Sequence, residues 1–125
     1  MPLATKLAEL VRACFTGIWI ESHEHQDAMM EIAQLCRDEE WRLAVWDIER
    51  GLHLPGQPAS ETTDAGAQDP LAAIRAVNAL ASDDGAALLL LQNFHRFLQS
   101  PEIVQALIHQ IIAGKQNRTF IVILS

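Results

Sequence analysis

Four short apolar runs, separated by segments with a helical pattern, constrain the fold of this 125-residue chain more than any other feature. The runs cover residues 15–20, 41–48, 86–91 and 119–124. Each is short for a buried helix, and most are rich in β-branched or aromatic residues, so each is expected to form a strand. Strands that alternate with helices of ~10–15 residues predict βαβ units and therefore a parallel sheet.

Sequence signals for four helices lie before and between these runs. Leu3, Leu7, Leu10 and Cys14 recur at helical spacing in the first. The second is expected to be capped by Ser22 and to extend to about Glu39, with its apolar face at Ala28, Ile32, Leu35 and Cys36. The third starts at Asp69-Pro70, a cap followed by proline at the first helical position.

The fourth helix is expected to open at Ser100-Pro101 and to stop at Gly114. Its inward face is predicted to comprise five apolar residues. They are Val104, Leu107, Ile108, Ile111 and Ile112.

The composition of the strands predicts their order in the sheet. Residues 86–91 form the most continuously apolar run, so this strand is expected to be central, covered on both faces, and next to residues 119–124. Arg42 and Asp47 make the run 41–48 more polar, as is typical of an edge strand. The predicted fold is therefore a three-layer α/β domain with a mostly parallel sheet of about four strands.

The domain organisation follows from the same pattern. Residues 53–68 contain two prolines and two glycines and are expected to form a flexible loop. The whole chain, residues 1–125, is expected to be one domain. It is interpreted as a fragment of a longer protein, because it ends where a central strand ends.

Charge and cysteine content exclude several classes of protein. The net charge is −7 and the nine basic residues are scattered, which leaves no footprint for a nucleic acid. No apolar run approaches the roughly 20 residues of a membrane span. Cys14 and Cys36 lack a CxxC spacing and are predicted to be buried, reduced thiols. With no signal peptide, this indicates a cytoplasmic protein.

Ligands of open parallel sheets bind outside the carboxyl ends of the strands. There, a phosphate-binding protein would have a glycine-rich loop with Lys-Ser/Thr after its first strand, but this chain has Ser22-His23-Glu24-His25. An acid that holds Mg²⁺ should follow the run 86–91, but Gln92 and Asn93 stand there. Because both requirements for phosphoryl transfer fail, we predict no catalytic, cofactor-binding or metal-binding residue.

Six residues near the carboxyl ends of the strands are nevertheless candidates for a functional edge: His23, Glu24, His25, Asp47, Asn93 and His95. A His-x-His pair can supply two metal ligands, and a histidine after a central strand can act as a general base. We favour simpler interpretations. His23 and His25 would lie at a solvated helix start, and the ring of His95 would bond the backbone between two inward-packed residues, Phe94 and Phe97. A small-ligand or metal-binding enzyme that uses His23, His25, Asp47 and His95 stays open as the alternative.

The segment Leu91-Gln92-Asn93-Phe94-His95-Arg96-Phe97-Leu98 resembles the motif after the third strand in a family of long AAA-type ATPases of bacteria and plastids. This family was first described as a conserved hypothetical chloroplast reading frame. Further pieces that resemble it follow in the same order: Ile18-Trp19-Ile20-Glu21-Ser22, Trp46–Leu52, Asp69-Pro70-Leu71 and Arg118–Ser125. The resemblance covers nearly the whole chain except residues 53–68.

The resemblance implies an amino-terminal, P-loop-less domain with a degenerate P-loop-NTPase-like (RecA/ASCE-like) topology. The Walker motifs, ATP and Mg²⁺ would belong to a separate carboxy-terminal domain, and no catalytic residue carries over. The implied function is a non-catalytic accessory or regulatory interaction domain. Its partner would be the parent's own ATPase domain or another protein.

The resemblance also implies a further strand beside the first one, which would come after the segment ending at Ser125. If that strand is missing, the first strand would present unpaired backbone groups beside an exposed Trp19. We therefore expect a homodimer through residues 15–20 or through the helix 3–13 beside them. The alternative is a monomer in which this helix folds across the edge. A receiver-type signalling domain is disfavoured, because the acidic pair after the first strand is missing.

Overall fold

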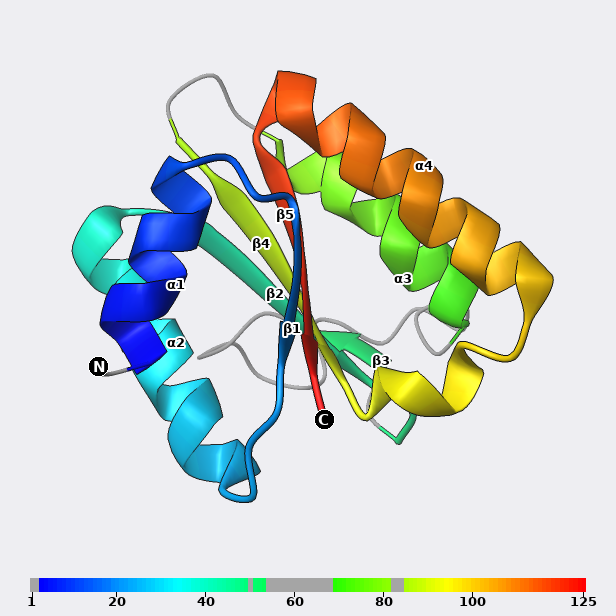
Figure 1. The fold of residues 1–125 in the computed structure, drawn as a ribbon, viewed down its shortest axis with the longest axis horizontal. Helices are drawn as coiled ribbons and strands as arrows, with labels where there is room; N and C mark the ends of the chain where they lie inside the picture. The colour runs from blue at the N-terminus through cyan, green and yellow to red at the C-terminus, as the bar shows by residue number, and fades with distance from the viewer. Residues whose placement is uncertain (1–2, 50, 54–68, 82–84) are drawn as a thin grey trace.

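The structure is a computed structural model that describes residues 3–49, 51–53, 69–81 and 85–125 (Figure 1). At its centre is one sheet, in which the first and last strands of the chain lie side by side. The order is β1 (Gly17–Ile20), β5 (Thr119–Leu124), β4 (Ala87–Gln92), β2 (Arg42–Asp47) and β3 (Gly51–His53). The expected loop 53–68 lies outside the described residues, except for His53 at the end of β3.

Four of these strands are parallel, and β3 is the exception. It pairs antiparallel with the second half of β2. The prediction that β2 is an edge strand is therefore wrong, and the sheet has five strands instead of about four. Gly51 permits the reversal between β2 and β3, since its φ of 72° lies in the left-handed region that favours glycine.

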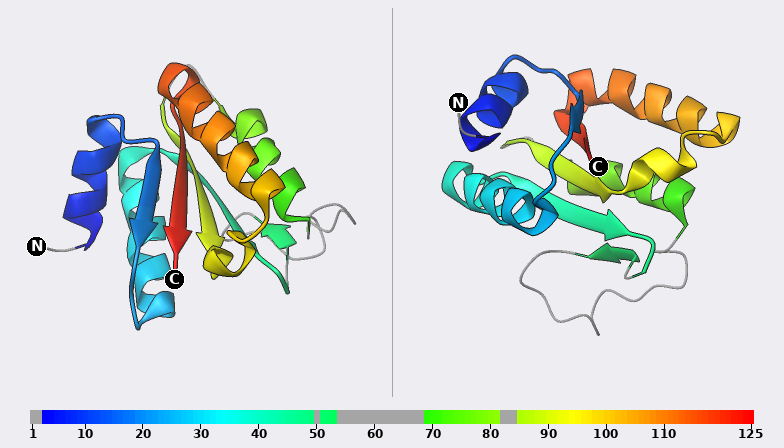
Figure 2. Two further views of the ribbon diagram at one scale, coloured as in Figure 1. Left: turned by 45° about the vertical axis from the view of Figure 1, so that its right-hand side comes forward. Right: turned by 60° about the horizontal axis from the view of Figure 1, so that its bottom comes forward.

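Helices cover both faces of the sheet, which confirms the three-layer α/β prediction. Helices α1 (Leu3–Arg12) and α2 (His25–Glu39) lie on one face. Helix α3 (Pro70–Ala76), the 3₁₀ turn η3 (Val77–Leu80) and α4 (Pro101–Asn117) lie on the other (Figures 1 and 2). No helix among the described residues is long and apolar enough to cross a membrane.

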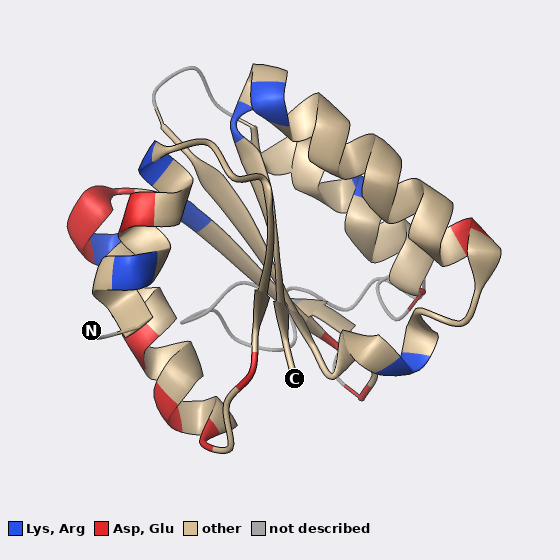
Figure 3. Ribbon diagram, viewed as in Figure 1, with Lys and Arg blue, Asp and Glu red and all other residues tan. Residues whose placement is uncertain are grey.

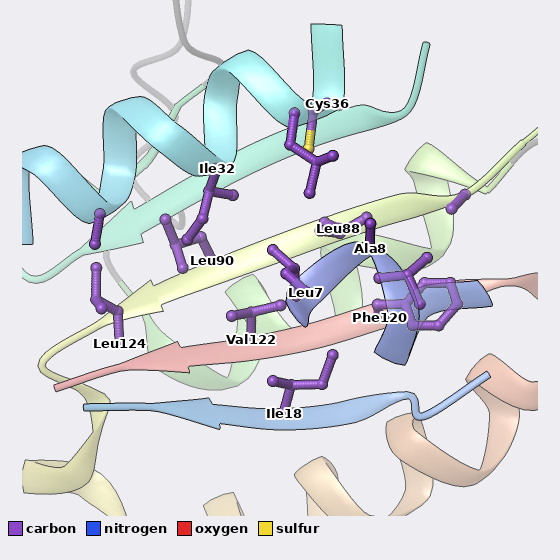
Figure 4. Close-up of a cluster of buried hydrophobic side chains, with 14 of the residues drawn as sticks. Leu7, Ala8, Ile18, Ile32, Cys36, Leu88, Leu90, Phe120, Val122 and Leu124 are labelled. Atoms are coloured by element: carbon purple, nitrogen blue, oxygen red, sulfur yellow. The ribbon is translucent and has the colours of Figure 1, made fainter. Parts of the chain in front are cut away.

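Alternate side chains of the central strands fill two separate cores. Leu88 and Leu90 of β4 point toward α1 and α2 (Figure 4), and Leu89 and Leu91 point toward α3 and α4. All four are fully buried. The prediction of a central strand covered on both faces is therefore confirmed, as is its pairing with β5.

The start of α2 differs from the prediction. The N-cap position is Glu24, and Ser22 lies two residues earlier, where its hydroxyl accepts a 3.1 Å hydrogen bond from the Glu24 N–H. Ser22 thus closes a turn before the helix and does not cap it. Asp69 does cap α3 as predicted, because its carboxylate accepts a hydrogen bond from the Leu71 N–H.

Helix α4 buries a different stripe from the predicted one: Ile103, Leu107, Gln110 and Gly114. Ile108 is 45% exposed and Ile112 is 63% exposed. Gln110 is accepted in the buried stripe because its amide exchanges hydrogen bonds with Asn78 and also donates to Thr119. The helix continues past Gly114 to Asn117, so this glycine does not stop it.

The two cysteines are free, with Cys36 buried and Cys14 partly buried. Burial raises the pKa of the Cys36 thiol to about 12. We therefore expect the native protein at pH 8 to be alkylated at Cys14 before Cys36, with rapid Cys36 labelling only after unfolding. Peptide mass mapping of iodoacetamide-treated protein checks this, and equal labelling of both thiols in the native state would contradict it.

The raised Cys36 pKa also has a consequence for stability. The unfolded chain loses the thiol proton near its ordinary pKa of 9.0, whereas the folded chain keeps it. Stability is therefore expected to fall as pH rises above about 9. Cys36→Ala should reduce this slope in denaturation curves, and an unchanged slope would contradict the assignment.

Candidate functional site

A hollow of about 800 Å³ lies at the carboxyl ends of β1, β5 and β4, and we call it the carboxyl-end hollow. Its lining comes from the end of β1, the turn into α2, the turn after β4 and the end of β5. The lining residues are Trp19, Glu21, Ser22, His23, His25, Asn93, His95 and Ser125.

Backbone hydrogen bonds hold the wall made by β1 and β5. The Ser125 N–H donates to Ile20 O, and the Ser22 N–H donates to Ser125 O, both at 3.0 Å. The indole N–H of Trp19 also donates to the Ser125 hydroxyl at 2.8 Å. The parallel ladder is thereby extended beyond the last residue of each strand.

The opposite wall is the turn after β4. Asn93 is in the left-handed conformation, with a φ of 55°, and its N–H donates to Leu124 O at 2.8 Å. The 3₁₀ turn η4 (Phe94–Phe97) follows. Phe94 is buried and Phe97 partly buried, and each ring meets Trp46 edge to face, with centroids 5.5 and 5.6 Å apart. The predicted inward packing of both rings is confirmed.

This packing leaves His95 exposed toward the hollow. Within the described residues its ring makes no hydrogen bond, so the predicted bond from the ring to the backbone is wrong. Its main chain holds the turn instead, because its carbonyl accepts from the Leu98 N–H at 3.3 Å.

The structure brings together four of the six candidate residues: His23, His25, Asn93 and His95. Glu24 is exposed and does not line the hollow. Asp47 is also outside it, since β4 and β5 separate β2 from β1. The Asp47 carboxylate accepts a 3.0 Å hydrogen bond from the Glu49 N–H in the turn after β2.

The six candidate residues predicted from the sequence do not include Trp19, Glu21 or Ser125. These residues lie in the hollow because β1 pairs with β5, which places residues 19–22 beside residue 125. That pairing depends on strand order, which apolar runs alone do not determine.

Charged side chains are few in the hollow. Among the described residues that line it, Glu21 has the one side-chain carboxylate, and none is Lys or Arg. Figure 3 shows acidic residues, and no Lys or Arg, on the turn between β1 and α2. In the part of the chain that the structure describes, no three His, Cys, Asp or Glu side chains are placed to hold a metal ion.

Comparison with known proteins identifies the family. No curated protein and no solved structure gave a significant match. One family model, described as the N-terminal domain of SpoVK-like AAA ATPases, matches residues 3–125. This span includes the whole sheet, every described helix and the carboxyl-end hollow. The chain therefore belongs to the family of SpoVK-like AAA ATPase N-terminal domains.

Proposed function

We propose that the chain is a non-catalytic accessory domain of an AAA-type ATPase, that its own nucleotide site is degenerate, and that it regulates by protein contact. The observation that carries the proposal is the composition of the carboxyl-end hollow. Where a P-loop would wrap phosphates with backbone N–H groups and a lysine, the hollow has Glu21, Ser22 and His23. A carboxylate at that place repels phosphate oxygens.

The last residue of β4 and the residue after it support the same conclusion. The Gln92 side-chain amide contacts Met29 Sδ of α2, and Gln92 does not line the hollow. Asn93 serves as the left-handed turn residue before η4. Neither side chain offers the carboxylate that a Mg²⁺ ion of a phosphoryl-transfer site requires.

The parallel part of the sheet supports a degenerate P-loop-NTPase-like topology. In the sheet, β1 and β2 are separated by two strands, β5 and β4, that come later in the chain. The first strand β1 therefore lies beside the last strand β5. In this proposal ATP and Mg²⁺ bind in the parent's separate ATPase domain. The cytoplasm is then the compartment in which the domain works, and its partner is that ATPase domain or another protein.

The proposal is tested by adding the purified 125-residue chain to the ATPase module of its own parent protein and measuring phosphate release. The chain alone is expected to release none, whereas the module's hydrolysis rate should change saturably with added chain. Phosphate release by the chain alone would contradict the proposal. An unchanged rate, with no binding to the module by calorimetry, would contradict the regulatory role.

A second candidate is a metal-binding or small-ligand-binding domain, because the hollow gathers the imidazoles of His23, His25 and His95. Under the preferred proposal, Zn²⁺ binds no tighter than to an ordinary surface histidine. Calorimetry with Zn²⁺ compares His23→Ala with His109→Ala, an exposed histidine on α4. Micromolar binding lost only in His23→Ala would favour the second candidate.

A further inference from the structure

A groove runs along the outer surface between α3 and α4, which pack side by side on one face of the sheet (Figures 1 and 2). It consists of two adjoining hollows of about 560 and 610 Å³, which share Arg75, Ala106 and His109. We call it the α3–α4 groove. It lies on a different part of the surface from the carboxyl-end hollow, and the two have no lining residue in common.

Small side chains on α4 leave the space for this groove. Ala106 and Ala113 are seven residues apart, which places them on the same side of the helix, and they line the groove together with Leu71 and Ile74 of α3. The side of the groove formed by α4 includes His109, whose ring is hydrogen-bonded to the Gln105 side chain at 2.9 Å. Apolar surface is therefore present in both hollows.

The face that contains the groove carries little charge (Figure 3). Helices α3 and α4 and the turn η3 have one acidic residue, Glu102, and two basic residues, Arg75 and Lys115. Helices α1 and α2, on the other face, have five acidic and three basic residues. A partner with carboxylates is therefore repelled from the face of α1 and α2 but not from the face of α3 and α4, although the whole chain carries −7.

Arg75 lies in the middle of the groove, because it lines both hollows. It is exposed, and within the described residues no hydrogen bond or ion pair engages its guanidinium. Glu102 lines one of the same hollows but makes no ion pair with it. A guanidinium binds a carboxylate with two parallel hydrogen bonds, so the groove offers a site for a carboxylate with apolar surface on either side.

We propose that the α3–α4 groove binds an amphipathic helix of a partner protein, in which two apolar side chains fill the hollows and an acidic residue between them binds Arg75. This inference rests on the protein-contact part of the proposed function. Along α4, one hollow extends from Pro101 to His109 and the other from Ala106 to Gln116, so their middles are ~9 Å apart. Residues seven positions apart on a helix have nearly this separation, ~10 Å, and lie on one face.

The walls of the groove favour a helix over an extended peptide. Backbone N–H and C=O groups in the middle of a helix are bonded within it, so neither α3 nor α4 offers the open strand edge that an extended peptide needs. The stretch of α4 from Pro101 to Gln116 is ~22 Å long, which matches a partner helix of about 15 residues.

The test is calorimetric titration of the 125-residue chain with a synthetic alanine-based helical peptide of about 15 residues. The peptide has two leucines seven positions apart and a glutamate between them on the same face. A control peptide has the same composition, with the glutamate moved to the opposite face. The first peptide is expected to bind with a dissociation constant of about 100 μM, and the control about tenfold more weakly.

Variants of the chain locate the binding. Arg75→Glu should weaken binding of the glutamate peptide about tenfold, and a peptide with lysine in place of that glutamate should restore it. Ala113→Phe should abolish binding, because the ring would fill one hollow. Arg37→Glu on α2 and Ala13→Phe after α1 make the same changes at exposed positions outside the groove and should leave binding unchanged.

The proposal would be overturned by no binding up to about 1 mM, by equal binding of the two glutamate peptides, or by control variants that weaken binding as much as those in the groove. A dimer in sedimentation equilibrium that Ala113→Phe disrupts would also overturn it, because a second copy would then fill the groove. The titration contains no ATPase module. Its failure therefore leaves phosphate release to decide the regulatory role, and a failed module assay leaves the peptide result standing.

Discussion

Truncation of Phe94 to alanine is expected to lower the free energy of unfolding by about 3–5 kcal/mol. The ring is fully buried and meets Trp46 edge to face, and its centroid is 5.4 Å from the centroid of the Phe97 ring. Its removal leaves a cavity beneath the turn that forms one wall of the carboxyl-end hollow. The loss includes both the transfer of the ring from water and the contacts around the cavity.

Urea denaturation followed by circular dichroism measures this effect, and the adjacent His95 provides the matched control. His95 is exposed and its ring makes no hydrogen bond within the described residues, so His95→Ala should change stability by less than about 0.5 kcal/mol. Similar losses for the two variants would contradict the structural account of this turn.

Replacement of Gly114 by alanine is expected to cost about 3 kcal/mol, although alanine favours helix more than glycine does. A Cβ at this position would overlap the Thr119 carbonyl oxygen and come within 3.2 Å of Thr16 Cβ. The first of these atoms belongs to β5 and the second to the segment before β1. To make room for the Cβ, α4 would therefore have to move away from the sheet.

Gly85 offers a control for the same substitution at an open position. Among the described residues, a Cβ there would meet only the Glu40 carbonyl oxygen, at 3.7 Å, which is an ordinary contact. Gly85→Ala should therefore be neutral or slightly stabilising in the same denaturation assay. If Gly114→Ala were equally neutral, the close approach of α4 to β5 would be wrong.

Central strands were predictable because burial on both faces removes polar residues from the sequence. All six residues of β5 are buried, and five of the six residues of β4 are. The short strand β3 was not predictable, because three residues carry no periodicity. The left-handed Gly51 at its start was the one available signal.

The buried stripe of α4 was misread because Gln110 and Gly114 look like surface and terminator residues. Hydrogen bonds to Asn78 and Thr119 make the glutamine compatible with burial, and close packing against β5 requires the glycine. Both reasons are contacts with distant segments, which the local pattern of a helix does not contain.

The sequence predicted the edge of the sheet at which the hollow lies, but not all of the residues that line it. The rule that ligands bind at carboxyl ends of parallel strands singled out His23, His25, Asn93 and His95, and these four residues line one hollow. Asp47 was included because it also ends a strand, yet strand order puts β4 and β5 between it and β1.

The central claim, that the carboxyl-end hollow is not a nucleotide site, is tested most directly by calorimetric titration of the 125-residue chain with ATP-Mg. Because the hollow presents Glu21 and no described Lys or Arg, the dissociation constant is expected to be millimolar or weaker. A micromolar dissociation constant that is abolished by His23→Ala, with the fold intact by circular dichroism, would contradict the claim.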